Sequence, residues 1–281
     1  MHIPAVICKA INSMVPKPTH PFNLAAGGCS SYSEWQFGRG YLALEHYKRM
    51  ADERQMLEGK TVLDIGCGAG GKTVYYATFN PRHIYGIDLS EGLIAEASEF
   101  AEKKGLQNKV TFKIEDASRL SFEDNFFDSI IMNDAVEHLD DPVAVLNECY
   151  RVLKQGGRLY TNFPPYYHPY GAHLSDVIGI PWVHMFFSEK TLIRVYKDLV
   201  SGLPDAQMRI DYRIGTAADG KEYFTHINKM TIRRFESIKR TLPFKTSYYY
   251  HVPLRGFLSL PSKIPLLREV FVKMVVCIFE K

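Results

Sequence analysis

Short apolar runs alternate with helical stripes between residues 60 and 163, and this alternation is the strongest pattern in the chain. Five of the runs predict buried strands, and they begin at Thr61, His83, Val110, Phe127 and Arg158. Between them apolar residues recur every three or four positions, which predicts helices over 72–79, 90–104 and 141–153. Strands that alternate with helices predict a mainly parallel α/β sheet, whose ligands bind at the carboxyl ends of the strands.

The flanking sequence is less regular than this core. Residues 1–30 carry irregularly spaced prolines and glycines and are expected to form an arm or flexible cap, and 41–57 predicts one helix. The later segments predict helices over 188–199 and 231–242, an irregular insertion over 205–226, and strands over 244–252 and 270–279. We therefore expect an N-terminal arm and cap helix (1–57), a core (58–163), and lid insertions with C-terminal strands that complete the same sheet (164–281).

Composition argues against several classes of protein. The hydrophobic share of 46% allows a sizeable core, and the net charge of +3 is too small to predict a nucleic-acid partner or an anionic membrane surface. The five cysteines are scattered without a Cys-x-x-Cys pair, so no disulfide framework and no metal site is predicted, and a reducing, cytoplasmic location is expected. No apolar stretch reaches the ~20 residues that a membrane-spanning helix needs.

The first predicted strand runs into a glycine loop, Asp64-Ile-Gly-Cys-Gly-Ala-Gly-Gly71. Glycines let a backbone turn tightly and approach a ligand closely, and the helix that follows offers free N–H groups. The spacing of Gly66, Gly68 and Gly71 also fits the G-x-G-x-x-G pattern of dinucleotide folds, which alone does not identify the ligand.

Acidic residues at three strand ends separate the alternatives. Asp64 would repel a pyrophosphate but suits an ammonium group, and Asp88, after the second strand, can accept hydrogen bonds from both hydroxyls of a ribose. Asp116, followed by the small Ala117, can take the exocyclic amine of adenine on its side chain, with a ring nitrogen on a backbone N–H. Together these groups describe a nucleoside with a cationic tail and no phosphates, a description that S-adenosylmethionine fits.

Residues 60–163 resemble a class I S-adenosylmethionine-dependent methyltransferase of the type 11, or UbiE-like, small-molecule group. The resemblance is carried, in order, by Val62-Leu-Asp-Ile-Gly-Cys-Gly-Ala-Gly-Gly, Gly86-Ile-Asp-Leu-Ser, Glu115-Asp-Ala, Phe127-Asp-Ser-Ile, Glu137-His-Leu and Arg151-Val-Leu-Lys-Gln-Gly-Gly. It implies a Rossmann-like sheet of seven strands with the last one antiparallel, helices on both faces, an N-terminal cap and insertions after the fifth strand. The segment 270–279 would supply the last strand.

The resemblance also implies which residues bind the cofactor. They are Gly66, Gly68 and Gly70 at the methionine moiety with Asp64 and Cys67 beside them, Asp88 and Leu89 at the ribose, Asp116 and Ala117 at the adenine, and Asn133 and Asp134 at the floor near the sulfonium. Tyr32 or Trp35 would close the pocket or, as an equal alternative, pack the cap helix on the sheet edge.

Simpler structural alternatives exist for these residues. The glycines could form only a tight turn between strand and helix, and Asp88 could serve only the start of a helix. Asp116 could form a turn before Ser118, Asp134 could cap a helix, and Cys67 is expected to be a small packed residue rather than a nucleophile.

Methyl transfer needs a base only when the acceptor arrives protonated with a high pKa, as a hydroxyl does. Histidines are the candidate bases, because their pKa lies near working pH. They are His138 after the fourth strand, and His168 and His173 in the aromatic-rich segment after the fifth. For His138 a pocket-shaping role is the alternative, and for the aromatic segment the alternative is a rigid connection.

The favoured function is methyl transfer to a small molecule, at oxygen, nitrogen or carbon. A sugar or lipid-linked acceptor, a nicotinamide-dependent oxidoreductase and a non-catalytic cofactor-binding subunit are the alternatives.

Nucleic acid is not expected, because Phe163 interrupts the Asn-Pro-Pro-Tyr motif of amino-directed enzymes in Asn162-Phe-Pro-Pro-Tyr166. Membrane contact through the basic helix over 231–242 or the apolar segment 258–267 is less favoured than a solvated surface. The sequence does not determine the oligomeric state.

Overall fold

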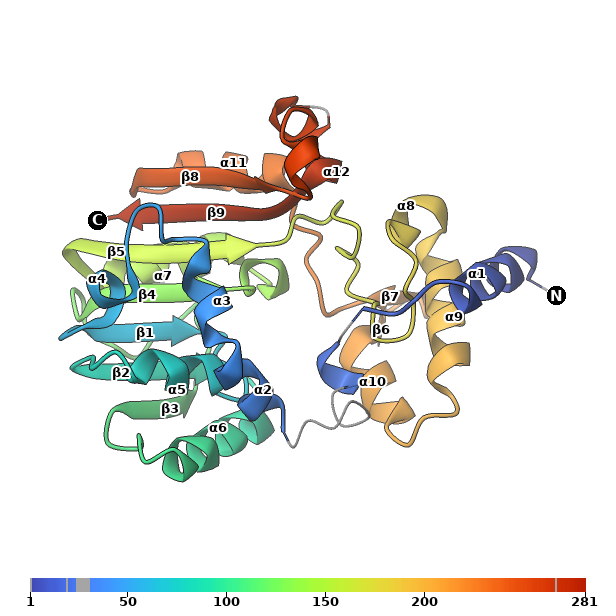
Figure 1. The fold of residues 1–281 in the computed structure, drawn as a ribbon. Coiled ribbons are helices and arrows are strands. Elements are labelled where there is room, and N and C mark those ends of the chain that lie inside the picture. The colour runs from blue at the N-terminus through green and yellow to red at the C-terminus, as the bar shows by residue number, and fades with distance from the viewer. Residues whose placement is uncertain (1, 19, 24–30, 266) are drawn as a thin grey trace.

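The chain folds around a seven-stranded sheet with the strand order β3-β2-β1-β4-β5-β9-β8 (Figure 1). The computed structural model describes residues 2–18, 20–23, 31–265 and 267–281. The strands of this sheet are β1 (Thr61–Ile65), β2 (His83–Asp88), β3 (Val110–Ile114), β4 (Phe127–Asn133), β5 (Leu153–Phe163), β8 (Lys245–Pro253) and β9 (Val272–Glu280). β1 to β5 run parallel, whereas β9 lies between β5 and β8 and is antiparallel to both. The predicted seven-stranded sheet with an antiparallel last strand is confirmed.

Helices cover both faces of this sheet. They are α5 (Gly71–Ala77) and α6 (Glu91–Lys103) on one face, and α7 (Pro142–Val152) and α11 (Ile232–Thr241) on the other. Neighbouring residues of one strand serve opposite faces: Val62 packs in the core with α5 and α6, and Leu63 packs with α7 and α11. Burial on both faces explains why the strands read as continuous apolar runs.

The cap beside α5 consists of three short helices, which corrects the single helix expected over 41–57. They are α2 (Tyr32–Gly38), α3 (Gly40–Glu45) and α4 (Glu53–Leu57). The helical pattern is interrupted because Asp52 starts a new helix: it accepts a hydrogen bond from the Gln55 N–H, and the Gln55 side chain accepts one from the Asp52 N–H. Glycine lets the cap sit close to α5, since a Cβ on Gly71 would lie 2.2 Å from the Ser33 carbonyl oxygen.

A second lobe stands at the carboxyl ends of the parallel strands (Figure 1). It contains α1 (Ile3–Ser13), α8 (Val183–Phe186), α9 (Glu189–Val200), α10 (Ala206–Arg213) and the hairpin of β6 (Ile214–Thr216) and β7 (Glu222–Phe224). The lobe has an apolar core of its own, to which α1 contributes Ala5 and Cys8. Helix α1 corrects the irregular arm expected over 1–30, and α10 with the hairpin corrects the irregular insertion expected over 205–226. Residues 1, 19 and 24–30 of the expected arm lie outside the described residues.

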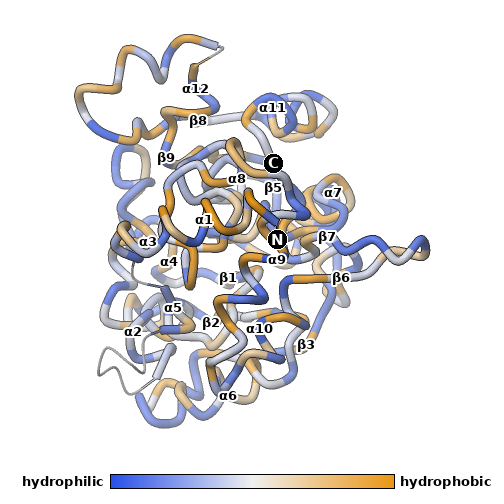
Figure 2. Tube along the Cα trace, turned by 90° about the vertical axis from the view of Figure 1, so that its right-hand side faces the viewer, coloured by the Kyte–Doolittle hydropathy of each residue, from blue (hydrophilic) through white to orange (hydrophobic). Residues whose placement is uncertain are grey.

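Helix α1 is anchored through Asn12, and apolar residues recur along it (Figure 2). The Asn12 side chain donates to the Val177 carbonyl oxygen and accepts from the Gly179 N–H, both at 2.8 Å. Ile3 and Ile7, by contrast, are 64% and 49% exposed. In the part of the chain that the structure describes, no helix has the length and apolar character needed to cross a membrane.

Two buried arginines hold the lobe together. Arg209 and Arg213 each lie 3.2 Å from a carboxylate oxygen of the fully buried Asp176. Arg209 also donates to the Phe22 carbonyl oxygen, and Arg213 donates to the Tyr196 hydroxyl. This network joins α9 and α10 to the segment 20–23, so the lobe is a structured unit rather than a loose insertion.

Candidate functional site

The glycine loop after β1 is a tight turn with an open side. Gly66, Gly68 and Gly70 have φ angles of 72°, 54° and 74°, a left-handed backbone that glycine adopts without strain. A Cβ on Gly70 would lie 2.6 Å from the Cβ of Ala97, so packing also requires glycine there. At Gly68, among the described residues, no heavy atom lies within 4 Å of the corresponding position, and the backbone is open to a ligand.

Asp88, at the end of β2, joins this loop to the start of α6. Its Oδ2 accepts a hydrogen bond from the Gly68 N–H and its Oδ1 accepts one from the Ser90 N–H, both at 3.0 Å. The side chain is half-buried, and each oxygen keeps a lone pair for a further donor. Asp88 therefore serves the start of the helix, and it can also accept the hydroxyls of a ribose.

Asp64 and Cys67 support the loop from inside. Asp64 is buried, and its Oδ2 accepts a hydrogen bond of 2.6 Å from the Thr73 hydroxyl in α5. Burial raises the pKa of Asp64 to about 6, although the Thr73 hydrogen bond opposes the shift. Cys67 is also buried, which raises the pKa of its thiol. Both side chains point into the protein rather than to the open side of the loop, whereas Leu89, next to Asp88, is 70% exposed.

The end of β3 lies directly beside Asp88. Asp88 and Ile114 are register partners, and the Glu115 N–H donates to the Asp88 carbonyl oxygen. Asp116 Oδ1 accepts a hydrogen bond of 2.8 Å from the Ser118 N–H, so Asp116 does form the turn that was its alternative role. Its Oδ2 is left available for a ligand. Ala117 is buried behind it. The ends of β1, β2 and β3 thus form one edge, with the groups expected for a nucleoside next to one another.

Asn133 and Asp134, at the end of β4, point in different directions. Asn133 is buried beneath the site, where it accepts a hydrogen bond from the Tyr47 hydroxyl and one from the Asn162 amide. This position corrects the expectation that Asn133 lines the floor. Asp134, in a left-handed conformation with φ of 54°, presents its carboxylate 2.8 Å from the Lys72 ammonium.

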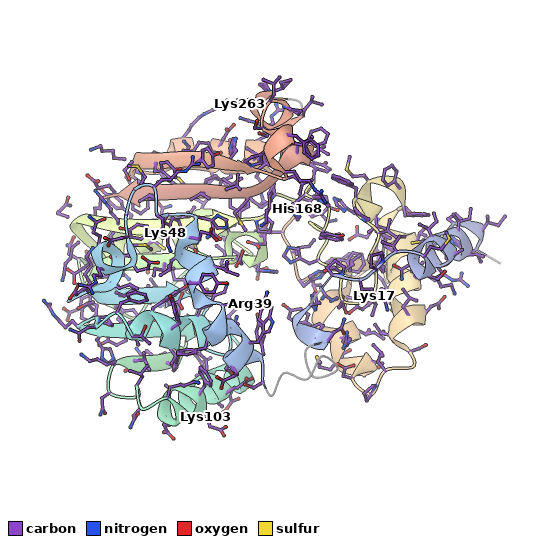
Figure 3. The ribbon with its side chains drawn as sticks, in the orientation of Figure 1. Lys17, Arg39, Lys48, Lys103, His168 and Lys263 are labelled. Atoms are coloured by element: carbon purple, nitrogen blue, oxygen red, sulfur yellow. The ribbon has the colours of Figure 1, made fainter. Side chains whose placement is uncertain are left out.

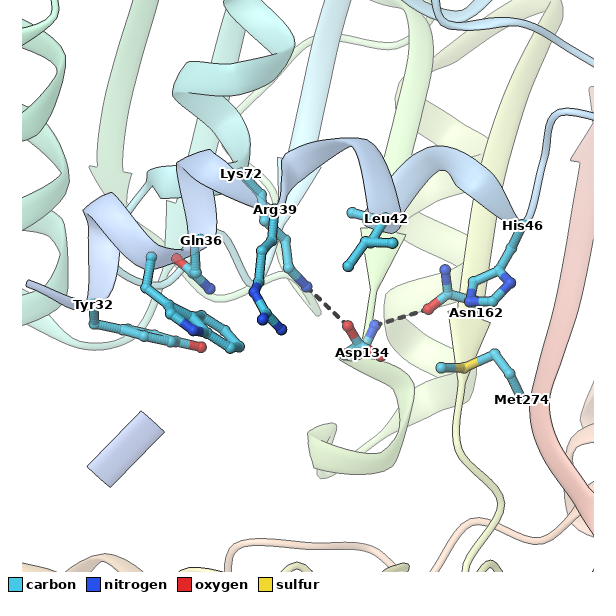
Figure 4. Close-up of a pocket in the computed structure, with 11 residues that line it drawn as sticks. Tyr32, Gln36, Arg39, Leu42, His46, Lys72, Asp134, Asn162 and Met274 are labelled. Carbon is cyan, nitrogen blue, oxygen red and sulfur yellow. Dashed lines mark hydrogen bonds and ion pairs between the residues drawn. The ribbon is translucent and has the colours of Figure 1, made fainter. Parts of the chain in front are cut away.

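A cavity of about 310 Å³ lies between the cap and the ends of β4 and β5 (Figure 4). The residues that line it are Tyr32, Trp35, Gln36, Arg39, Leu42, Ala43, His46, Lys72, Asp134, Asn162 and Met274. Its size falls at the lower end of the roughly 300–1,000 Å³ that small-molecule sites occupy. The glycine loop and Asp88 do not line the cavity; it adjoins the loop at Lys72, which directly follows Gly71.

Lys72 and Asp134 form an ion pair at the cavity wall. Burial alone would raise the pKa of Asp134, but the Lys72 ammonium outweighs it and brings the pKa below its usual range. The Asp134 carboxylate in turn raises the pKa of Lys72 against the effect of burial. Both groups therefore stay charged near neutral pH, and the carboxylate can attract a cationic group that enters the cavity.

Aromatic residues of α2 form the opposite wall (Figure 4). The Tyr32 and Trp35 rings are stacked with centroids 6.1 Å apart, and the Arg39 guanidinium lies 4.9 Å from the Trp35 centroid. Ser31 fixes the start of this helix, since its hydroxyl accepts a hydrogen bond from the Glu34 N–H. The predicted Tyr32 thus faces the cavity, together with a cation from the same cap.

Two of the three predicted histidines come together. The rings of His138, in the short helix η3 (Val136–His138), and His173 are T-shaped with centroids 5.0 Å apart. Burial lowers the pKa of His138. The pKa of His173 lies well below its usual range, mainly because the ring is buried and secondly because His138 lies beside it. Both imidazoles are therefore neutral near pH 7 and can accept a proton. His168 lies in the connection between sheet and lobe (Figure 3), beside Tyr170, where burial lowers its pKa to about 4.

Several groups near the site are absent from the residues expected from sequence, including Arg39 and His46 in the cavity wall. Lys72 directly follows the glycine loop, so its position was a usable signal. Tyr212 and His226 come from the lobe, and no local pattern marks them: the Tyr212 ring lies 6.1 Å from the His226 ring. Partial burial is the main cause of a raised pKa of Tyr212, and the Asp88 carboxylate adds to it, so the lobe approaches the end of β2.

Residues 63–161 match a protein family described as "Methyltransferase domain". This range begins in β1 and ends in β5. It contains the glycine loop, Asp88, Asp116, Asp134 and His138, and it leaves out the cap and the lobe.

Curated relatives match about half of the chain. A sterol 24-C-methyltransferase of Aspergillus fumigatus is 34% identical over 149 residues, which cover 49% of this chain and 39% of that protein. Phosphoethanolamine N-methyltransferase 3 of Arabidopsis thaliana is 36% identical over 126 residues, which cover 44% of this chain and 25% of that protein. The matched part is thus well under half the length of either relative.

Solved structures match over most of the chain at low sequence identity. The [4+2]-cyclase SpnF superposes with a TM-score of 0.55 and 18% identity, over 88% of this chain and 83% of its own. A geranyl diphosphate methyltransferase in complex with SAM superposes with a TM-score of 0.54 and 14% identity, over 87% of this chain and 84% of its own. A cyclase and a methyltransferase share this fold, so the fold alone does not establish the reaction and the site has to be argued by itself.

Proposed function

We propose that this chain, which contains a class I S-adenosylmethionine-dependent methyltransferase domain over residues 63–161, moves a methyl group from S-adenosylmethionine to a small molecule. The observation that supports this most strongly is the edge formed by the ends of β1, β2 and β3. It combines an open glycine backbone at Gly68 with acceptors at Asp88 and Asp116. The matched domain family favours methyl transfer over the nicotinamide-dependent alternative.

The cofactor would lie along this edge. The Asp88 carboxylate would accept the ribose hydroxyls, and Asp116 with Ala117 would bind the adenine. The loop Gly66–Gly70 would lie against the methionine moiety. The charged Asp134 would lie near the sulfonium, where its carboxylate stabilises a positive charge.

The acceptor would occupy the cavity between the cap and β4. Attack by an acceptor lone pair on the methyl carbon forms the new bond, while the carbon–sulfur bond breaks and its electron pair stays on sulfur. Tyr32 and Trp35 would exclude water from this space. A hydroxyl acceptor must also lose a proton, and the neutral imidazoles of His138 or His173 would accept it.

The cavity walls favour an acceptor with an apolar part and an anionic part. Leu42, Ala43 and Met274 supply apolar surface, and Arg39 supplies a cation. The named relatives act on a sterol and on phosphoethanolamine, one apolar and one carrying a phosphate. A sugar or lipid-linked acceptor and a cytoplasmic location stay predictions.

Calorimetry with S-adenosylhomocysteine and with NAD on the purified chain tests the cofactor assignment. We expect saturable heat with the first compound and none with the second. Absence of heat with S-adenosylhomocysteine in a folded sample would contradict the proposal. Transfer of labelled methyl groups into a metabolite extract then separates an enzyme from a non-catalytic subunit, which would bind the cofactor but label nothing.

A further inference from the structure

Three potential metal ligands meet where the sheet faces the lobe. Glu137 and His138 come from η3, directly after β4, and His173 comes from the connection that follows β5. One ligand atom of each residue lies within 4.8 Å of the others, and Glu137 Oε1 is 4.0 Å from His138 Nε2. Because 35 residues separate His138 from His173, no local spacing in the sequence marks this group.

The Glu137 carboxylate lacks a partner that would explain its burial. The residue is 3% exposed, and within the described residues neither carboxylate oxygen accepts a hydrogen bond. Buried carboxylates in proteins are paired, hydrogen-bonded or bound to a metal ion. The nearest polar partner given for it is His138 Nε2, which lies 4.0 Å from Glu137 Oε1 and is too far away for a hydrogen bond.

The surrounding chain presents the His138 ring in the orientation of a ligand. His138 Nδ1 donates to the His226 carbonyl oxygen at 2.5 Å, which leaves the lone pair on Nε2, the nitrogen that faces Glu137. Metal-binding histidines commonly donate their second nitrogen to a carbonyl or carboxylate in this manner, which fixes the ring and its tautomer.

A clamp from the lobe fixes the turn that carries Glu137 and His138. The Asn228 side chain donates to the carbonyl oxygens of Val136 and Leu139 at 2.7 and 2.8 Å. The Asn228 N–H donates to the carbonyl oxygen of Glu137 at 2.7 Å. Three carbonyls of one short turn are thus held by a single residue, and the two ligands on that turn have little freedom to move apart.

We propose that Glu137, His138 and His173 bind one divalent transition-metal ion. Two imidazole nitrogens and one carboxylate oxygen form the donor set that Zn²⁺ and Fe²⁺ accept in proteins. In a tetrahedral site with ligand bonds of roughly 2.1 Å, two donors of one ion lie about 3.4 Å apart, so the longest separation of 4.8 Å must shorten by about 1.4 Å. Because the His226 carbonyl fixes the His138 ring, rotation of the His173 and Glu137 side chains would supply this shift.

The charges near this cluster are compatible with a cation. Lys72 is paired with Asp134, and Arg213 is paired with Asp176. The Glu137 carboxyl has no such partner among the described residues. If the proposed methyl transfer holds and an acceptor hydroxyl reaches the ion, the ion would lower the pKa of that hydroxyl, with the histidines then acting as ligands rather than as bases. The binding of the ion itself does not depend on that reaction.

Metal binding can be measured on the whole chain without cofactor or acceptor. We expect the chelator-treated protein to take up one equivalent of Zn²⁺ in equilibrium dialysis, and Co²⁺ to give visible absorption bands that Zn²⁺ displaces. His173→Ala and Glu137→Gln should each weaken Zn²⁺ binding at least 100-fold. His83→Ala is the matched control, because His83 lies at the start of β2 with its Nε2 on Thr111, and it should bind Zn²⁺ as the wild type does.

The result that would overturn the proposal is less than half an equivalent of Zn²⁺ on the wild-type chain, or unchanged binding in His173→Ala. Should Glu137→Gln fail to fold, as judged by circular dichroism, the partly exposed His138→Gln replaces it with the same expectation. S-adenosylhomocysteine binding is measured separately in the metal-free protein. Loss of one kind of binding with retention of the other therefore shows which of the two proposals has failed.

Discussion

Replacing Asp88 with alanine should weaken the binding of S-adenosylhomocysteine. The Asp88 carboxylate already accepts two backbone N–H groups, from Gly68 and Ser90, and each oxygen has one further lone pair for a ribose hydroxyl. A hydrogen bond to a charged acceptor contributes about 1.5–3 kcal/mol. Loss of one such bond therefore raises Kd roughly 10- to 150-fold, and loss of two raises it further.

The same substitution also removes an acceptor from the loop itself, so its effect on folding has to be separated. Asp88→Asn keeps one acceptor oxygen without the charge and should give an intermediate loss of affinity. Asp219→Ala is a suitable control, because Asp219 lies in the exposed turn between β6 and β7 and, among the described residues, its side chain accepts only the Lys221 N–H. This control should bind the ligand as the wild type does.

Isothermal calorimetry provides the Kd of each variant, and thermal unfolding without ligand shows that each one is folded. The expected order of affinity is wild type and Asp219→Ala first, then Asp88→Asn, then Asp88→Ala. If Asp88→Ala is folded and binds within twofold of the wild type, then Asp88 does not hold the ribose, and its role is confined to the start of α6.

Three further substitutions test the structure around the site. The pKa of Asp64 in the folded protein, about 6, lies above its unfolded value of 3.8, so protonation of this carboxyl stabilises the folded state. This contribution to the free energy of unfolding is fully present below pH 3.8 and falls by about 3 kcal/mol as the pH rises to 6. Asp64→Asn should remove this slope from urea unfolding measured at pH 4 to 7. Gly71→Ala should lower Tm by several degrees, since its Cβ would lie 2.2 Å from the Ser33 carbonyl oxygen, whereas Gly92→Ala, with open space, should not. Asp176→Asn leaves two buried guanidinium groups without their shared carboxylate and should cost about 3–5 kcal/mol in urea unfolding; an unchanged midpoint would contradict the assigned ion pairs.

The sheet could be predicted from sequence because its signals are local. Each of the first five strands is a short apolar run, and the helices between them start at recognisable caps, such as Ser90 and Asp141. The late strand over 270–279 was also found, and it occupies β9. Its antiparallel direction followed from the family resemblance, whereas its position between β5 and β8 was not predicted, since nothing in an apolar run states which neighbour it pairs with.

The elements that differed from prediction depend on competing local or distant contacts. The capping box at Asp52 overrides a helical stripe that continues through it. The fifth strand was expected to begin at Arg158, but β5 begins at Leu153, and a register shift between Phe127 and Ser129 of β4 absorbs the extra residues. Helix α1 is stabilised by the core of the lobe, whose other members lie more than 150 residues later in the chain.

The cofactor edge could be predicted better than the rest of the site for a geometric reason. Parallel strands end at the same edge, so residues that follow β1, β2 and β3 are neighbours whatever the intervening helices do. Asn133 shows the limit of this reasoning. β4 is buried on both faces, so the side of the strand to which a polar residue points cannot be read from its apolar neighbours.

The two parts of the site are therefore held by different cores. Asp88, Asp116 and the glycine loop depend on the sheet, whereas His173, Tyr212 and His226 depend on a lobe with its own apolar core and its own buried ion network. The lobe contacts the sheet at η3 through Asn228 and His226. A change in how the lobe sits would thus alter the surroundings of Glu137 and His138 while leaving Asp88 bonded to its own loop. Binding of the cofactor at the sheet edge and binding of the proposed metal ion can for this reason vary independently.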